Sequence, residues 1–277
     1  MTKDPHLIFL LLGLFFVPLE RAFAIMRHQS IVRKGLVTDF IYFLSNKYLN
    51  QFGQLVLVSI IVPTYHYLAK TNSVTAVENS VPFWIELTEV IILADFLVYW
   101  AHRLTHHIPF LWKFHAIHHS NTELDWLAAF RLHFLDQIFT KAISMVPIFL
   151  MGFSKETIEI NIIFITVHAA FNHSNVRISL PILRYIICTP EFHRWHHSTD
   201  PKYAYKHFAG SFAIWDYLFG SGMRMDGSFP KEIGLSNPIP DSFLEQLKYP
   251  FQQWLLPLQT NLRNKRSMAW NTRLTKV

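Results

Sequence analysis

The sequence predicts an all-α protein with several membrane-spanning helices, on three observations. Hydrophobic residues make up 51% of the 277 residues, and charged residues only 16%. Soluble domains carry about 25% charged residues. The mean hydropathy is positive, at +0.20, and the apolar residues are gathered in segments of helical length, which is typical of chains that cross a bilayer.

Five apolar segments make up the predicted membrane part. We expect residues 7–19 to be retained as an anchor, because they lack the strongly basic start and small-residue cleavage site of a signal peptide. Residues 52–68 and 83–101 are longer and are predicted spans. Residues 134–153 and 156–171 are predicted to form a shallow helical hairpin. The prediction is thus three spans plus a hairpin, four to five segments in all.

Residues 173–277 contain no further predicted span and are expected to form a helical cap with a Pro-rich tail. Basic residues follow the first segment, whereas only Lys70 follows the second, so the positive-inside rule places the end of the first segment in the cytosol. Alternation then places residues 102–133 and the cap on the cytosolic side. The sequence allows either a bacterial inner membrane or the endoplasmic reticulum.

The composition also excludes several kinds of site. A single cysteine, Cys188, excludes an intrachain disulfide and any Cys-rich metal site, so a metal must be held by nitrogen and oxygen. The net charge of +6 comes from scattered Lys and Arg residues without a nucleic-acid-binding motif. Anionic lipid head groups are the more economical explanation of the charge, and we expect no nucleic-acid partner.

Thirteen of the sixteen histidines lie between His102 and His207. Two segments are near copies, Phe-His-x-x-His-His-Ser at 114–120 and at 192–198. Positions i, i+3 and i+4 share one face of a helix, so the three imidazoles of each copy are expected to point at one place. His102 and His106 are four residues apart, and Asp95 falls on the same helical face, where a carboxylate could accept from a metal-bound imidazole.

Ten histidines are too many for one transition metal, and two metals sharing the cluster is the natural solution. Imidazole suits iron, copper, zinc and nickel, so the spacing alone does not name the metal. The Glu-x-x-His pairs of carboxylate di-iron bundles and the His-Glu-x-x-His motif of zinc proteases are absent from the sequence. The predicted ligands are His102, His106, His115, His118, His119, His133, His173, His193, His196 and His197.

These boxes and their flanks resemble the fatty acid hydroxylase / sterol desaturase superfamily of integral-membrane di-iron oxygenases. The likeness covers roughly residues 85–222. It includes Asp95-Phe-Leu-Val-Tyr-Trp-Ala-His-Arg-Leu-Thr-His106, Leu111-Trp-Lys-Phe-His-Ala-Ile-His-His-Ser120, Thr189-Pro-Glu-Phe-His-Arg-Trp-His-His-Ser198 and Trp215-Asp-Tyr-Leu-Phe-Gly220. Two positions depart from the family pattern: Phe134 follows His133 where the family usually has Pro, and His207 stands where Asn is common.

The resemblance implies two iron ions, O2 as cosubstrate, and hydroxylation or desaturation of a C–H bond in a lipid such as a fatty acyl chain or a sterol. Zinc also binds such sites well. The chain has neither a cytochrome b5-like His-Pro-Gly-Gly segment nor a Gly-rich nucleotide motif, so electrons are expected from an external cytochrome b5, ferredoxin or reductase. The expected organisation is anchor helices at 1–82, a catalytic domain at 83–222 and a tail at 223–277.

Residues expected to orient the ligands are less clearly marked, because each could equally cap a turn. Two other functions stay open on the residues alone: a membrane zinc hydrolase, and a divalent-metal transporter. The histidine number is excessive for the first, and the position of the boxes at segment ends does not fit the second. The expected orienting residues are Asp95, Asn175, Glu191, Asp200, His207 and Asp216.

Overall fold

A computed structural model describes residues 5–70, 81–178 and 180–254, and throughout these ranges the regular structure is helical. Two isolated antiparallel bridges, Ala24 with Val176 and Ser198 with Ile233, are the β-type pairings within the described part of the chain. Residues 255–277 of the predicted tail lie outside the described residues. The helical class therefore agrees with the sequence, and the differences concern the membrane.

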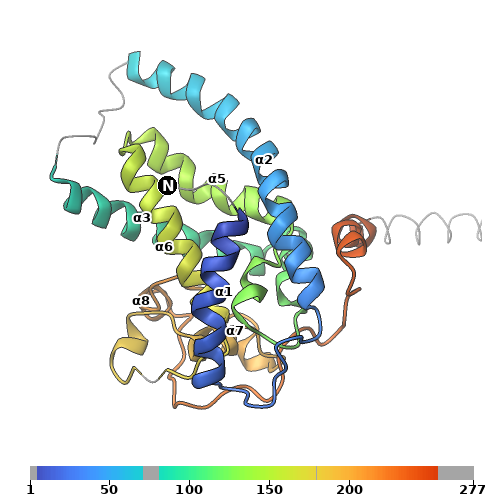
Figure 1. Cartoon of the computed structure of the whole chain (residues 1–277). Coiled ribbons are helices and arrows are strands. Elements are labelled where there is room, and N and C mark those ends of the chain that lie inside the picture. Colours follow the sequence, from blue (N-terminus) through green and yellow to red (C-terminus); the bar gives the residue numbers. More distant parts are fainter. Residues whose placement is uncertain (1–4, 71–80, 179, 255–277) are drawn as a thin grey trace, which may run out of the picture.

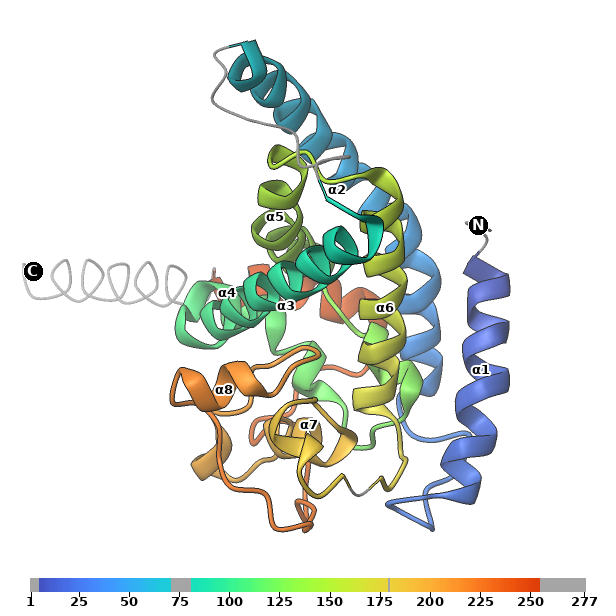
Figure 2. The same cartoon turned by 90° about the vertical axis from the view of Figure 1, so that its left-hand side faces the viewer.

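Long helices form the upper part of the molecule, apart from the N-terminal one, which runs down to the level of a cap of short helices and irregular segments (Figures 1 and 2). The long helices are α1 (Pro5–Ala22), α2 (Leu36–Lys70), α3 (Phe83–His107), α5 (Phe134–Leu150) and α6 (Lys155–His173). The short α-helices are α4 (Pro109–His115), α7 (Pro190–His196) and α8 (Ile214–Leu218). Single 3-10 turns are η1 (His118–Ser120), η2 (Trp126–Phe130), η3 (Leu183–Tyr185) and η4 (Pro201–Tyr203), and residues 243–254 are also helical.

The prediction of three spans plus a hairpin is wrong. Among the described residues, no helix combines the length and the apolar character needed to cross a membrane. Charged side chains interrupt the apolar runs, and some of them make internal contacts. Glu86 of α3, for example, is buried and accepts hydrogen bonds from the Ser154 backbone N–H and the Thr157 hydroxyl, where α6 begins. Such a carboxylate fastens one helix to another.

Two apolar clusters hold the long helices together. Val90 and Ala94 of α3 pack with Ile148 of α5 and Ile158 of α6. The second cluster joins α1, α2, η2 and α6 through Leu12, Phe16, Phe43, Trp126, Leu127 and Ala170. Fully burying an aliphatic or Phe side chain stabilises a fold by about 1.5–3 kcal/mol, so these clusters fix where the ends of α3 and α6 lie.

The cap is organised by helix N-caps and by its own apolar cluster. The Thr189 hydroxyl accepts from the Phe192 N–H and begins α7, with Pro190 in the first helical turn, a position that Pro favours. Cys188, Phe192, Ala209, Ala213 and Met225 form the apolar cluster beneath this helix. The cap therefore presents α7 to the lower ends of α3 and α6.

A buried ion network connects the start of α2 to the turn between η2 and α5. Asp39 accepts from both Arg33 and Arg131, and Arg33 also contacts Asp125. A charge buried without its partner costs about 3–5 kcal/mol, so this network strongly favours one position of the Arg131 backbone.

Candidate metal centre

Nine of the ten predicted ligands come together in two groups at the junction of the long helices and the cap. Within each group the candidate ligand nitrogens all lie within 4.8 Å of one another. His102 is half-buried and the other eight side chains are buried. Group A consists of His102, His106, His115, His119 and His196. Group B consists of His118, His173, His193 and His197.

The expectation that each three-histidine box points at one place is wrong. The first box does not lie on one helix, because His115 ends α4 and His118 begins the separate 3-10 turn η1. In the second box α7 ends at His196, and His197 is its C-cap. Each box divides its imidazoles between group A and group B. Neighbouring residues in the chain therefore serve different groups.

The second ring nitrogen of most of these histidines is held by a hydrogen bond. Carbonyl and carboxylate oxygens only accept, so Nδ1 carries the proton in these rings and Nε2 presents a lone pair. The Nδ1–H groups of five histidines donate: His102 to the Phe208 carbonyl (2.7 Å), His115 to the Asp136 carboxylate (2.9 Å), His118 to the Arg131 carbonyl (3.2 Å), His173 to the Ala169 carbonyl (2.8 Å) and His196 to the Lys206 carbonyl (2.9 Å).

Burial keeps eight of these imidazoles neutral. Loss of hydration is the main cause. Nearby positive charge adds to it, from Arg194 and Arg33 at His173 and from other imidazoles at His196, so the pKa of His173 falls to about 4 and that of His196 to about 3. Neutral imidazole is the form that binds a metal ion. The pKa is also lowered well below its ordinary value in His102, His106, His118, His119, His193 and His197.

The ligand nitrogens converge with too few protons to satisfy one another. In group A, the Nε2 atoms of His106, His119 and His196 are buried without a hydrogen-bond partner. Buried polar atoms left unpaired cost about 1–3 kcal/mol each. Close contacts between Nε2 atoms add to the problem: His102 with His115 at 3.0 Å, and in group B His118 with His173 at 3.0 Å, His173 with His193 at 3.0 Å and His193 with His197 at 3.1 Å. A cation at the centre of each group would satisfy these lone pairs, so both donor sets fit a metal ion.

His133 is not brought to either group. It is the N-cap of α5, where its Nδ1 accepts from the Leu135 N–H and its Nε2–H donates to the Leu247 carbonyl. The helix that it begins carries Asp136 in its first turn, and this carboxylate is the one that holds His115. In this structure His133 therefore acts on group A only indirectly, by capping the helix that carries Asp136.

Two predicted orienting carboxylates fix the segment between α7 and α8. Asp95 does not accept from a histidine. It accepts from the Ser211 and Phe212 N–H groups and from the Trp215 indole. Asp216 accepts from the Phe208 and Ala209 N–H groups, and the Phe208 carbonyl in turn accepts from His102. Asp216 thus holds the backbone segment whose carbonyl orients His102 of group A.

The other predicted orienting residues make local contacts. Asn175 pairs with the backbone of Met26, and Glu191 accepts from the Gly227 N–H and lies 3.6 Å from Arg184. Asp200 caps η4. His207 stacks on Phe192 and has a left-handed backbone, with φ of 62°. Asn and His are both among the non-Gly residues enriched in that conformation, so His207 can stand where the family commonly has Asn.

Sequence reasoning missed three contacts of group A. Asp136 was not among the predicted residues, although its place three residues after His133, at the start of a helix, is a signal that could have identified it. Trp112 lies against His106 and His119, with ring centroids 4.9 and 5.3 Å apart. Phe208, fully buried, lies 5.2 Å from the His106 ring. These two aromatic side chains pack against imidazoles of group A.

Comparison with known proteins agrees with this geometry. A family model described as fatty acid hydroxylase matches residues 87–221, the stretch that contains every histidine of groups A and B. The resemblance of residues 87–221 to the fatty acid hydroxylase / sterol desaturase superfamily is therefore confirmed. No solved structure matches it significantly.

Several curated members of this superfamily are similar to the chain. An ornithine lipid hydroxylase from Rhizobium tropici is 32% identical over 176 residues, covering 62% of this chain and 52% of the relative. An alkylglycerol monooxygenase from Danio rerio is 28% identical over 244 residues, covering 84% and 52%. A relative from Arabidopsis thaliana named as a sterol desaturase is 30% identical over 144 residues, covering 48% and 46%. The chain spans about half the length of these relatives.

Proposed function

We propose that this chain is an oxidoreductase that uses two iron ions, one in group A and one in group B, to hydroxylate a C–H bond of a lipid with O2. The observation that carries the proposal is the pair of buried, neutral imidazole groups whose Nε2 lone pairs converge. The catalytic unit is proposed to be residues 83–222. The names of the relatives support hydroxylation ahead of desaturation, because two of the three describe a hydroxylase or a monooxygenase.

The number of imidazoles supports iron over zinc. Group A has five imidazoles, while a catalytic zinc keeps three protein ligands and a water. The zinc hydrolase alternative is therefore not favoured.

The protein's own residues orient the ligands and keep the site dry. When bound, iron supplies the redox chemistry that activates O2, and the polypeptide supplies position and surroundings. Asp136 fixes the ring of His115, and the carbonyls of Phe208 and Lys206 fix those of His102 and His196. Trp112 limits the access of water to group A.

The proposed reaction takes a lipid C–H bond, O2, two electrons and two protons to an alcohol and water. One oxygen atom enters the C–H bond and the other leaves as water, so two electrons must come from a donor. We propose a separate one-electron redox protein or reductase, such as a cytochrome b5 or a ferredoxin, as that donor.

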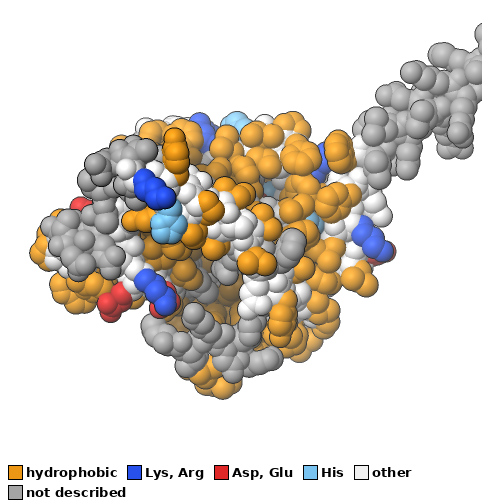
Figure 3. All heavy atoms as spheres, turned by 90° about the horizontal axis from the view of Figure 1, so that it is seen from above, with side chains coloured by type: hydrophobic (Ala, Val, Ile, Leu, Met, Phe, Trp, Pro, Cys, Tyr) orange, Lys and Arg blue, Asp and Glu red, His pale blue; other side chains and the backbone are white. Residues whose placement is uncertain are grey.

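The exposed apolar side chains support a position at a lipid membrane. In the view from above, apolar side chains cover much of the surface and charged ones lie mainly toward its edge (Figure 3). Apolar patches larger than a few hundred Å² commonly mark membrane or protein contacts. Side chains that contribute exposed apolar surface on the long helices include Leu55, Val56, Val58, Ile60, Trp84, Ile85, Ile92, Phe149, Ile162 and Ile163.

The test is lipid mass spectrometry of cells that express the chain under labelled O2 with iron supplied. Gain of one labelled oxygen atom in a lipid, and its loss in the His118→Ala variant, is the expected result. Loss of two hydrogens without oxygen would indicate desaturation. Purified protein with a single zinc and hydrolase activity would refute the proposal.

A further inference from the structure

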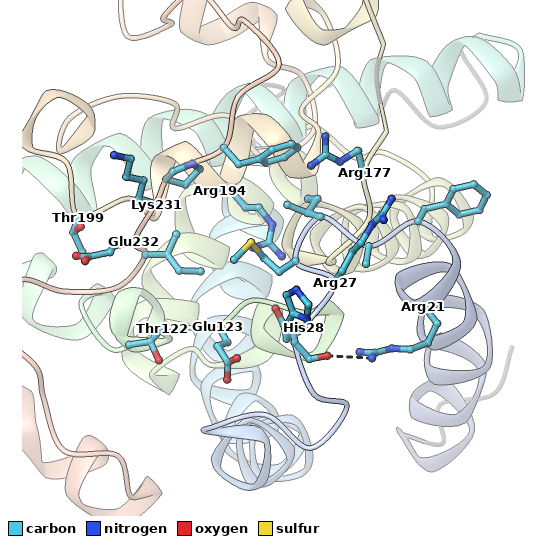
Figure 4. Close-up of a pocket in the computed structure, with 18 of the residues that line it drawn as sticks. Arg21, Arg27, His28, Thr122, Glu123, Arg177, Arg194, Thr199, Lys231 and Glu232 are labelled. Atoms are coloured by element: carbon cyan, nitrogen blue, oxygen red, sulfur yellow. Dashed lines mark hydrogen bonds between the residues drawn. The ribbon is translucent and has the colours of Figure 1, made fainter.

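A cavity of about 1380 Å³ lies at the end of α1, next to the cap but away from groups A and B. Its walls come from the segment after α1, the turn before η2, the segment after α6 and the segment around Phe229 (Figure 4). None of the nine grouped histidines lines it. The proposed reaction therefore does not account for this cavity, here called the basic cavity.

Cations outnumber carboxylates around the basic cavity. Two carboxylates line it, Glu123 and Glu232, and the Glu123 side chain already accepts from the Lys34 N–H. None of the lining cations makes an ion pair within 4.0 Å in the described part of the chain. Unneutralised cations around a hollow attract an anion. The five cations are Arg21, Arg27, Arg177, Arg194 and Lys231, and Figure 4 shows them around one space.

Arg194 is the buried member of this set, with 3% of its surface exposed. Its Nη2 donates to the Leu124 carbonyl at 2.9 Å, but its Nε–H is buried without an acceptor. Burial lowers the pKa of Arg194 only to about 10, so the side chain remains charged at neutral pH. The carboxylates of Glu20 and Asp125 offset part of its charge, but neither lies within 4.0 Å of it, so its Nε–H still lacks an acceptor that an anion could supply. Arg is the side chain that best recognises carboxylates and phosphates.

The basic cavity adjoins an apolar one. Arg21 lines both the basic cavity and a second cavity of about 300 Å³ between α1 and α2, here called the apolar groove. Only Glu20, Arg21 and Asp125 carry charge in the groove. Its apolar lining is Phe9, Val17, Ile31, Leu36, Val37, Phe40, Trp126 and Leu127. A cationic hollow beside an apolar groove matches a ligand with an anionic head and a hydrocarbon tail.

We propose that the basic cavity binds the phosphate or carboxylate group of a single-chain lipid, with its hydrocarbon chain in the apolar groove. The α7 helix separates this ligand from the metal centre, since His193 faces group B while the adjacent Arg194 lines the cavity. A helix with side chains is about 10–12 Å across, so the anionic group lies about one helix width from group B. The inference goes beyond the proposed function, because this binding requires neither iron nor turnover.

The test is isothermal titration calorimetry, which measures the affinity of the metal-free full chain for two probes in a neutral maltoside detergent. The probes are dodecyl phosphate and inorganic phosphate. Dodecyl phosphate is expected to bind at least about tenfold more tightly than inorganic phosphate, because only it fills the groove. Arg27→Gln with Arg177→Gln should weaken both probes about tenfold, because charge-assisted contacts are lost. Both side chains are exposed, so the fold should tolerate the change.

Matched variants separate the cavity from the overall charge and from the groove. Lys155→Gln with Lys202→Gln removes the same charge from exposed positions outside the cavity and should leave both affinities unchanged. Val37→Glu, in the groove, should weaken dodecyl phosphate alone.

Three results would overturn the proposal. Equal affinity for the two probes would show that the site binds a free anion and not a lipid. Equal losses of affinity in the cavity variant and the control variant would show that overall charge, and not the cavity, is responsible for binding. Stronger binding of poly-glutamate than of dodecyl phosphate would assign the surface to an acidic protein instead. A chain that lacks hydroxylase activity but binds as described would refute only the proposed function.

Discussion

Two neighbouring residues at the end of α7 test whether the histidines serve separate metal ions. His196 belongs to group A and His197 to group B, although one peptide bond joins them. In His196→Ala group A keeps four of its five imidazoles, and in His197→Ala group B keeps three of four. Each variant is expected to bind about one iron per chain at limiting iron, because removing a ligand costs more than the roughly 10–100-fold known for outer-shell substitutions.

The stability change follows from the same division. Iron at about 100 times its Kd adds about 2.7 kcal/mol per filled site, which raises Tm by about 5 °C in a chain of this size. The unmodified chain should therefore gain about 10 °C on iron loading, and each single variant about 5 °C. Metal analysis and thermal unfolding with and without iron provide the measurement.

The control is His107→Ala. His107 follows His106 but is exposed and belongs to neither group; it donates to the Arg103 carbonyl and its ring lies near Tyr205 and Phe208. This variant should keep about two irons and the full rise in Tm. The double variant His196→Ala/His197→Ala should show almost no rise. Loss of both irons in either single variant, or retention of both, would refute the division into two groups.

Two further predictions concern the surroundings of the groups. Asp136→Asn keeps the side-chain shape but removes the charge that His115 Nδ1–H meets, so iron affinity of group A should fall about 10–100-fold in a competition titration, while group B is unchanged; an equal loss in both would contradict the contact. Metal-free protein should lose stability as the pH falls from about 6.5 to about 4. In this range His173 and His196 become protonated in the unfolded chain but stay neutral in the folded chain, because their pKa values are lowered there. Each of these residues should lower the free energy of unfolding by about 1.4 kcal/mol per pH unit in urea denaturation, and a constant value would contradict their burial.

The sequence predicted which histidines come together better than it predicted how they are divided. Spacing alone marked the three doubled boxes, because imidazoles three or four residues apart share a helical face. The division of the histidines between the two groups could not be read from the spacing. The helix ends at His115, and a separate 3-10 turn begins at His118. Such a boundary depends on packing against Arg131 and the cap. His133 was taken as a ligand because it matches a family histidine, while its cap position is a property of the folded chain.

The membrane prediction failed for a related reason. Hydropathy treats Glu86 and Asp95 only as interruptions in an apolar segment. It does not show which groups these carboxylates contact in the folded chain. In the structure Glu86 binds the start of α6 and Asp95 binds the segment around Ser211. Buried carboxylates that accept backbone N–H groups are part of a packed protein interior, and only long-range contacts reveal them.

The peptide bond between His196 and His197, together with that between His118 and His119, also limits how far apart groups A and B can lie. Consecutive Cα atoms are about 3.8 Å apart in any trans peptide, whatever the surrounding helices do. Small shifts of α3 or α6 would therefore change how strongly each group holds an ion, while covalent geometry keeps the two groups next to each other. A chemistry that depends on two metals acting together would in this way tolerate considerable motion and sequence drift in the helices around it.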